Sequence, residues 1–273
     1  MWSFAKQDVV KPKPGVMAML QGMFGQLICS LFCVIPFAIP SLAKAETLHL
    51  TSLNWPPYTG EKLQQGGVTV VIITAAMNAV GHQVKVDYYP WSRVLRLVKR
   101  DDSIYRGYFP EYLYPTEDYV FSDPVGHSPL GLIEQADFPL KWQQVRDLNR
   151  YQLGVVQDYV NTYELDGMIA NGSQKVELAN SDEHNIQKVA TGRVQGAVID
   201  RHVFNYLVDQ THLKPLKNKL QFNKQLLELR SLHIAFKNNP EGIKWRDTLN
   251  RGLKQIDQDK IIQAYWTALA LDD

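Results

Sequence analysis

The chain has 273 residues, of which 45% are hydrophobic and 21% are charged, and its formal net charge is +1. This composition is typical of a globular protein and excludes a disordered or collagen-like chain. A net charge this small gives no strong field for nucleic acid, so we expect no nucleic-acid partner.

The N-terminal segment, residues 1–45, has the features of a secretory signal peptide. Lysines lie near the start, an almost wholly apolar run follows at 27–39, and Ala43-Lys44-Ala45 provides an A-x-A cleavage site. As a helix the apolar run would be about 20 Å long, which is short for a hydrocarbon core of about 30 Å. We therefore expect cleavage after Ala45 and a periplasmic protein. The alternative is an uncleaved membrane anchor.

Both cysteines of the chain, Cys29 and Cys33, precede the expected cleavage site. Residues 46–273 would therefore carry no disulfide, and a chain of this length can bury roughly 70% of its unfolded surface without one. The lack of thiols excludes cysteine catalysis and thiolate metal ligands. The histidines show no paired spacing. We therefore expect no metal site and no cofactor.

Strands alternate with helices along the rest of the chain. Apolar periodicity predicts strands at 47–53, 83–89, 104–109, 119–121, 127–135, 153–156, 175–178, 196–199 and 229–236. It predicts helices at 68–80, from Pro90 onward, and at 159–170, 182–192, 201–209, 240–256 and 260–269. Such short alternating units predict an α/β fold with mainly parallel sheets.

Six short motifs follow one another along the chain: NWPPY, PWSRVLRLV, TEDYVFSDPV, DLNRYQLGVV, GRVQGAVID and AFKNNPEGIKWRDTLNRGLKQI. Their order resembles that of the family 3 extracellular solute-binding proteins, in the subgroup with a Pro-Trp-x-Arg helix. The resemblance implies a two-lobe, periplasmic-binding-protein-like fold of type II with a hinge and an interlobe cleft. It also implies a discontinuous first lobe, 46–137 plus 230–273, and a second lobe, 138–229.

Two positions depart from the amino-acid binders of that family. Those proteins carry an arginine that clamps the carboxylate of the ligand, but the stretch Pro115-Thr116-Glu117-Asp118 has none. They carry Gly-Ser or Gly-Thr after a strand of the second lobe, where this chain has Gln157-Asp158-Tyr159. Asp200, at the position that holds the ligand's ammonium group, is retained. The resemblance thus implies a cationic or neutral polar ligand rather than an ordinary amino acid.

The candidate ligand contacts each have a structural alternative. They are Trp55, Trp91, Arg93, Tyr108, Glu111, Tyr114, Gln157 and Asp200. Trp55 would stack on the ligand or pack its own loop, and Arg93 would supply the missing positive charge or lie in solvent. Asp158 is expected to cap a helix, and Asp200 either binds ligand or only caps. Tyr58 is expected to be structural.

The leading interpretation is a monomer that captures a small polar solute by lobe closure. It would deliver the solute to an ABC importer or report it to a membrane sensor, and it would not be an enzyme. One alternative is a dehydratase-type lyase on the same fold with Glu111 as general acid, although its carboxylate-binding arginine is missing. The other is a membrane-tethered sensing domain.

Overall fold

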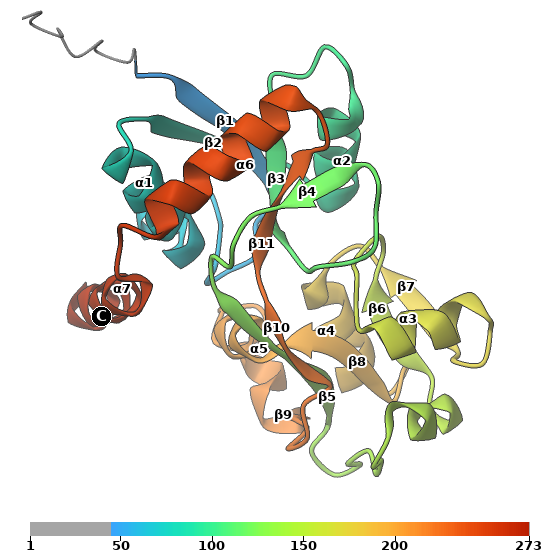
Figure 1. Ribbon diagram of the computed structural model, residues 1–273. Helices are drawn as coiled ribbons and strands as arrows, with labels where there is room; N and C mark the ends of the chain where they lie inside the picture. Colours follow the sequence, from blue (N-terminus) through green and yellow to red (C-terminus); the bar gives the residue numbers. More distant parts are fainter. Residues whose placement is uncertain (1–44, 273) are drawn as a thin grey trace, which may run out of the picture. The chain divides into compact units, whose positions relative to one another are not determined.

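The structure, a computed structural model, describes residues 45–272 (Figure 1). The expected signal peptide, apart from its last residue, lies outside this range. Within the described part of the chain, no helix combines the length and the apolar character needed to cross a membrane.

The strands form two separate sheets. They are β1 (Thr47–Ser52), β2 (Gln83–Tyr88), β3 (Gly107–Glu111), β4 (Tyr119–Phe121), β5 (His127–Gln135), β6 (Leu153–Val156), β7 (Val176–Ala179), β8 (Gly196–Asp200), β9 (Leu220–Phe222), β10 (Glu228–Ser231) and β11 (His233–Lys237). The first sheet has the order β2-β1-β3-β11-β4, and the second has the order β10-β5-β8-β6-β7 with β9 beside β5. In each sheet a parallel core, β2-β1-β3 or β8-β6-β7, continues into antiparallel strands.

Helices accompany each sheet (Figure 1). They are α1 (Val68–Ala79), α2 (Trp91–Lys99), α3 (Tyr163–Ala170), α4 (Asp182–Ala190), α5 (Arg201–Val208), α6 (Pro240–Leu253) and α7 (Gln258–Asp272), with 3-10 turns at Gln64–Gly66, Val145–Arg150 and Lys214–Lys219. We call the first sheet with α1, α2, α6 and α7 lobe 1, and the second sheet with α3, α4 and α5 lobe 2. Buried side chains lie in both lobes, such as Phe109 and Phe236 in lobe 1 and Leu132 and Ile133 in lobe 2, and they belong to one continuous hydrophobic cluster.

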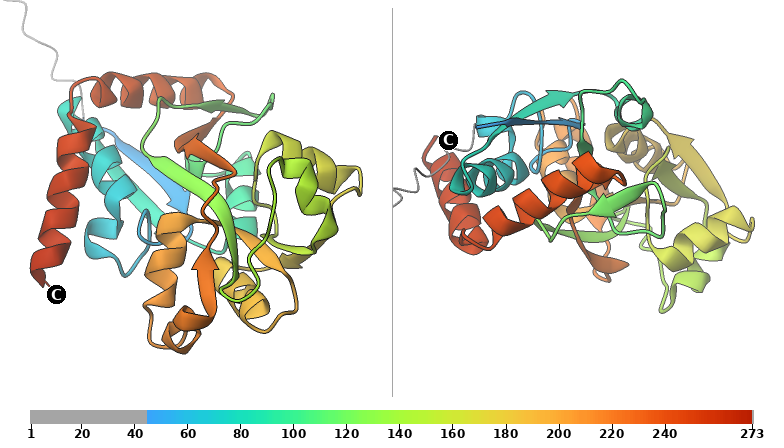
Figure 2. Two further views of the ribbon diagram at one scale, coloured as in Figure 1. Left: turned by 90° about the horizontal axis from the view of Figure 1, so that it is seen from below. Right: turned by 45° about the horizontal axis from the view of Figure 1, so that its top comes forward.

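The strand pairing divides the chain at other residues than expected. Strand β5, expected in lobe 1, pairs with β8 and with β10, so it belongs to the sheet of lobe 2. The expected single strand at 229–236 is two strands, β10 in lobe 2 and β11 in lobe 1, joined through Leu232. The chain therefore passes between the sheets at 122–126 and again at Leu232, and Figure 2 shows these neighbouring passages.

Helix α3 begins later than the sequence pattern predicts. The side chain of Thr162 accepts a hydrogen bond from the backbone N–H of Leu165 and so caps this helix. Asp158, the expected cap, has a left-handed backbone with φ of 64° and lies before the helix. Its side chain instead accepts a hydrogen bond from Ser92 of lobe 1, 2.6 Å away.

Two helical glycines provide a matched test of the packing. A Cβ at Gly252 in α6 would lie 2.0 Å from the backbone oxygen of Ala76 in α1, whereas a Cβ at Gly167 in α3 would meet no heavy atom within 4 Å. We expect Gly252→Ala to lower the free energy of unfolding by about 1–3 kcal/mol, because overpacking forces the helices apart. Gly167→Ala should raise it by about 0.5–1 kcal/mol. Denaturant unfolding measures both, and equal stabilities would contradict this packing of α6 on α1.

Candidate binding site between the two lobes

A small cavity of about 40 Å³ lies between the lobes. Its lining comes from both sides and consists of Leu53, Trp55, Trp91, Pro110, Glu111, Tyr112, Leu130, Val156, Tyr159, Val160, Asn161, Asp182, Val198, Ile199, Asp200 and Leu232. A volume of this size holds about three water molecules. A solute with several heavy atoms therefore enters only if the lobes separate or if a side chain moves out of the cavity.

Three carboxyl groups line this cavity, and all three are buried. The exposed fractions are 6% for Glu111, 6% for Asp182 and 1% for Asp200. No lysine, arginine or histidine is among the lining residues in the described part of the chain. Burial raises the pKa of Glu111 to about 8 and the pKa of Asp182 to about 7, and it also raises the pKa of Asp200. The cavity therefore favours a proton or another positive group beside these oxygens.

Asp200 lies at the end of β8 and both caps a helix and faces the cavity. Its Oδ1 accepts hydrogen bonds from the backbone N–H groups of His202 at 2.6 Å and Val203 at 2.9 Å, which begin α5. Its Oδ2 accepts from the hydroxyl groups of Ser128 at 2.6 Å and Tyr58 at 2.9 Å. The two roles considered for Asp200 are therefore compatible, because each uses a different oxygen.

Asp182 is a site residue that the sequence analysis did not single out. It begins α4 directly after the cap Ser181, and its Oδ2 accepts a hydrogen bond from Trp55 Nε1 at 3.1 Å. Strands β7 and β8 both run parallel to β6, so their carboxyl ends meet at one edge of the sheet. The order of strands and helices could have pointed to Asp182, because this shared edge of the sheet brings the start of α4 beside Asp200.

Lobe 1 bonds directly to lobe 2 on both sides of the cavity. On one side, Trp55 and Tyr58 donate to Asp182 and Asp200. On the other, Trp91 Nε1 donates to the backbone oxygen of Asp158 at 2.9 Å, next to the bond from Ser92. These contacts describe a closed arrangement that is held by the protein's own side chains.

Arg230 in β10 adds a further link across the lobes. Its guanidinium donates to the backbone oxygen of Leu113 in lobe 1 at 2.8 Å and to that of Asn161 in lobe 2. It also lies over the ring of Tyr112, 4.6 Å from the ring centroid. The positive charge of Arg230 lowers the pKa of Glu111, but burial outweighs it. The guanidinium thus serves backbone oxygens rather than a solute carboxylate.

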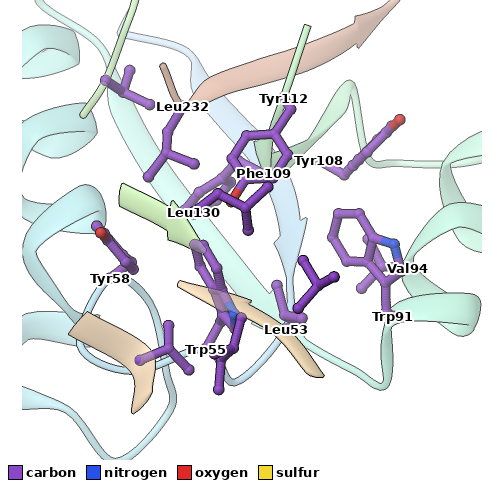
Figure 3. Close-up of a cluster of buried hydrophobic side chains, with 14 of the residues drawn as sticks. Leu53, Trp55, Tyr58, Trp91, Val94, Tyr108, Phe109, Tyr112, Leu130 and Leu232 are labelled. Atoms are coloured by element: carbon purple, nitrogen blue, oxygen red, sulfur yellow. The ribbon is translucent and has the colours of Figure 1, made fainter. Parts of the chain in front are cut away.

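Aromatic and aliphatic side chains gather at this part of the structure, among them Trp55, Trp91 and Tyr112 of the cavity lining (Figure 3). The rings of Trp55 and Tyr58 are stacked, with centroids 4.8 Å apart and planes inclined by 22°. Trp91 meets Tyr108 and Tyr159 edge to face, with centroid distances of 5.5 and 5.9 Å. The walls of the cavity are therefore mainly apolar and aromatic, and the carboxyl groups provide its polar points.

Four of the eight expected contacts line the cavity: Trp55, Trp91, Glu111 and Asp200. The other four lie elsewhere: Arg93, Tyr108, Tyr114 and Gln157.

The positions of these four residues have local causes. Arg93 lies on the exposed face of α2, since Trp91, Val94 and Val98 form its buried face, and its guanidinium lies 4.5 Å from the centroid of the Tyr89 ring. Gln157 is exposed just after β6.

The hydroxyl groups of Tyr108 and Tyr114 lie 3.0 Å apart and bond to each other. Arg93, expected to supply positive charge, therefore stacks on a ring outside the cavity. Tyr108 and Tyr114, expected to contact the ligand, bond to each other outside it. Among residues 45–272, no group of three or more His, Cys, Asp or Glu side chains is arranged to hold a metal ion.

No protein-family model and no curated protein sequence matches this chain. Solved structures match its fold. One is an ancestral arginine-binding protein bound to arginine, with 15% identity, a TM-score of 0.65, and coverage of 80% of this chain and 97% of that one. Another is a histidine kinase sensor domain with similarity to periplasmic binding proteins, with 16% identity, a TM-score of 0.68, and coverage of 81% and 95%.

A third similar structure is an ancestral amino-acid-binding protein described as a precursor of cyclohexadienyl dehydratase. It has 16% identity, a TM-score of 0.61, and coverage of 81% of this chain and 94% of that one. These likenesses confirm the expected fold class, an α/β, two-lobe fold like that of periplasmic binding proteins. At such identities they describe the fold and leave the ligand to the residues of this chain.

Proposed function

We propose that this protein binds a small solute between its two lobes and that the bound group is cationic or a strong hydrogen-bond donor. The observation that carries the proposal is the set of three buried carboxyl groups, Glu111, Asp182 and Asp200, around one cavity without a basic lining residue. A positive group placed there would pair with charges that are otherwise costly to bury. The aromatic walls would contact the apolar part of the solute.

An ordinary amino acid fits this site poorly, because nothing at the cavity would pair with its carboxylate. Arg93 lies on the outer face of α2, and the guanidinium of Arg230 bonds to two backbone oxygens. An unpaired buried carboxylate costs several kcal/mol. The proposed solutes are therefore amines, or amino acids whose carboxyl group is blocked.

The proposed setting is the periplasm, with the protein acting as a monomer that passes its solute to an ABC importer or reports it to a membrane sensor. The similar structures include both an ancestral arginine-binding protein and a histidine kinase sensor domain. A pull-down from membranes, with and without the bound solute, would separate the two roles by capturing either a permease or a sensor.

A dehydratase-type lyase is the second candidate, and one observation favours it. Glu111 is buried in the cavity and its pKa is raised to about 8, so it would be protonated and able to act as a general acid at neutral pH. One similar structure is a precursor of such an enzyme. Incubation with a carboxylated cyclohexadienol tests this candidate, since loss of water would give an aromatic product with a strong ultraviolet absorbance.

A thermal-shift series tests the binding proposal. Butane-1,4-diamine, 4-aminobutanoate and succinate share a four-carbon chain and differ in the charges at their ends. At pH 8.5 the diamine should raise the unfolding midpoint, and succinate should leave it unchanged, because a specific ligand stabilises the folded state by mass action. L-Arginine amide should likewise raise the unfolding midpoint more than L-arginine does. Equal stabilisation by succinate and the diamine would overturn the proposal.

Arg93→Ala should leave the affinity for the best-stabilising amine of this series unchanged within about twofold. Its side chain lies outside the cavity and stacks on Tyr89 within lobe 1. Calorimetric titration of the variant measures this. A large loss of affinity would show that Arg93 turns inward to contact the solute.

A further inference from the structure

The loop between β1 and α1 places two side chains against the cavity's carboxyl groups. Trp55 Nε1 donates to Asp182 Oδ2 at 3.1 Å, and the Tyr58 hydroxyl lies 2.9 Å from Asp200 Oδ2. Both aromatic residues are buried. The loop belongs to lobe 1 and both carboxylates belong to lobe 2. One short segment thus reaches across the cleft to two of the three carboxyl groups.

The geometry of this loop holds both donors in place. The two rings stack on each other, and Trp55 and Thr59 exchange backbone hydrogen bonds of 2.7 and 3.2 Å. The hydroxyl of Thr59 lies 3.0 Å from that of Ser52, which anchors the loop to β1. The indole and phenol donors are therefore fixed in position before they meet lobe 2, which lowers the entropy lost when the lobes close.

The donors also match the chemistry expected of a solute. An indole N–H and a phenol O–H present polarised hydrogens to carboxylate oxygens, as the ends of an amine would. Asp200 is fully engaged in this arrangement, because each of its oxygens accepts two hydrogen bonds. Only about 40 Å³ remains empty beside the rings. An amine at Asp200 and Asp182 would therefore have to take the places of Tyr58 and Trp55.

We propose that the Trp55–Tyr58 pair is an internal occupant of the acidic cavity, which holds the lobes closed in the absence of solute and which a cationic solute must displace. The identity of the competing solute rests on the proposed function, whereas the closed ligand-free state does not. Affinity is then set by a competition, and a weaker internal occupant gives tighter solute binding.

Energy transfer between dyes on the two lobes tests the closed state without any ligand. Lys99 in lobe 1 and Lys175 in lobe 2 are exposed and provide labelling positions as Lys99→Cys and Lys175→Cys. Cys29 and Cys33 are replaced by serine so that only these positions react. The labelled full chain then carries further substitutions that remove single donors and keep an aromatic ring.

Tyr58→Phe should lower the transfer efficiency of the ligand-free protein, and Trp55→Phe with Tyr58→Phe should lower it further. Tyr105→Phe is the matched control, because its hydroxyl bonds to Asp87 at 3.0 Å within lobe 1. It should leave the transfer unchanged. A circular dichroism spectrum confirms folding, and Trp55→Phe alone serves if the double variant does not fold. Unchanged energy transfer in the folded variants would overturn the proposal that Trp55 and Tyr58 hold the lobes closed.

The affinity for butane-1,4-diamine provides the second readout. Tyr58→Phe should bind the diamine about three- to tenfold more tightly than the original protein, since a competing hydrogen bond is removed. If Tyr58→Phe bound the diamine equally well or more weakly, the proposal that Tyr58 competes with the solute would be overturned. If the transfer falls as expected and the diamine binds neither protein, the closed state stands and the proposed solute class is wrong.

Discussion

The unfolding midpoint of the ligand-free protein should fall as the pH rises from about 5 to about 9. Burial raises the pKa of Asp182 from 3.8 to about 7 and that of Glu111 from 4.5 to about 8. Below about pH 3 both groups are protonated in the folded and the unfolded chain. At higher pH the unfolded chain loses these protons first, so stability is lost progressively up to about pH 8 and then stays level. Each group contributes about 1.4 kcal/mol per pH unit, so we expect a decrease of up to roughly 7 kcal/mol in the free energy of unfolding between pH 5 and pH 9.

Denaturant unfolding at several pH values measures this decrease. Asp182→Asn should remove a large part of it and make the protein more stable than the original at pH 9. Glu177→Gln is the control, since Glu177 pairs with Lys188 and Arg193 away from the cavity, and this pairing lowers its pKa. Glu177→Gln should be no more stable than the original protein at pH 9. A stability that stays flat from pH 5 to 9 would contradict the description of the cavity carboxyl groups.

Asp200→Ala should lower the free energy of unfolding by about 3 kcal/mol. The substitution removes the cap of α5, which costs about 1 kcal/mol, and leaves the buried hydroxyls of Ser128 and Tyr58 without their carboxylate acceptor. Asp200→Asn should cost less, because its amide oxygen can still accept the backbone hydrogen bonds at the start of α5. In both variants Tyr58 keeps the backbone oxygen of His127, 2.9 Å away, as an acceptor.

The matched control for this prediction is Ser181→Ala, which removes the cap of α4 alone. It should cost about 1 kcal/mol. Denaturant unfolding at pH 6 compares the three variants. If Asp200→Ala and Ser181→Ala cost the same, Asp200 would be only a helix cap, and its hydroxyl partners across the cleft would contribute nothing to stability.

Local patterns were sufficient for most elements of the fold, because alternation and end signals act within a few residues. The bounds 127–135 of β5 were predicted as observed. The break between β10 and β11 was not, since the run 229–236 shows no local signal at Leu232 and each half is defined by its partner strand. Likewise, nothing local shows that Asp158 accepts hydrogen bonds from Trp91 and Ser92, far away in the sequence, while Thr162 caps α3.

The same distinction between local patterns and long-range contacts explains which site residues could be predicted. Asp200 ends β8 and Trp55 follows β1, so the resemblance to a known motif order led to both residues. Arg93 was a candidate for its charge, although it lies two residues from Trp91, a spacing that places it on another face of α2. Asp182 was missed because its role depends on Trp55, which comes from the other lobe.

Calorimetric titration with butane-1,4-diamine at pH 8.5 tests the central claim most directly, namely that the buried carboxyl groups bind a cationic solute. The original protein should bind the diamine and should not bind succinate. Asp200→Asn should weaken diamine binding about 10- to 100-fold, the effect expected when a hydrogen bond to a charged group is lost. Glu177→Gln should leave it unchanged. Binding of succinate, or diamine binding that is equally tight in Asp200→Asn, would contradict the claim.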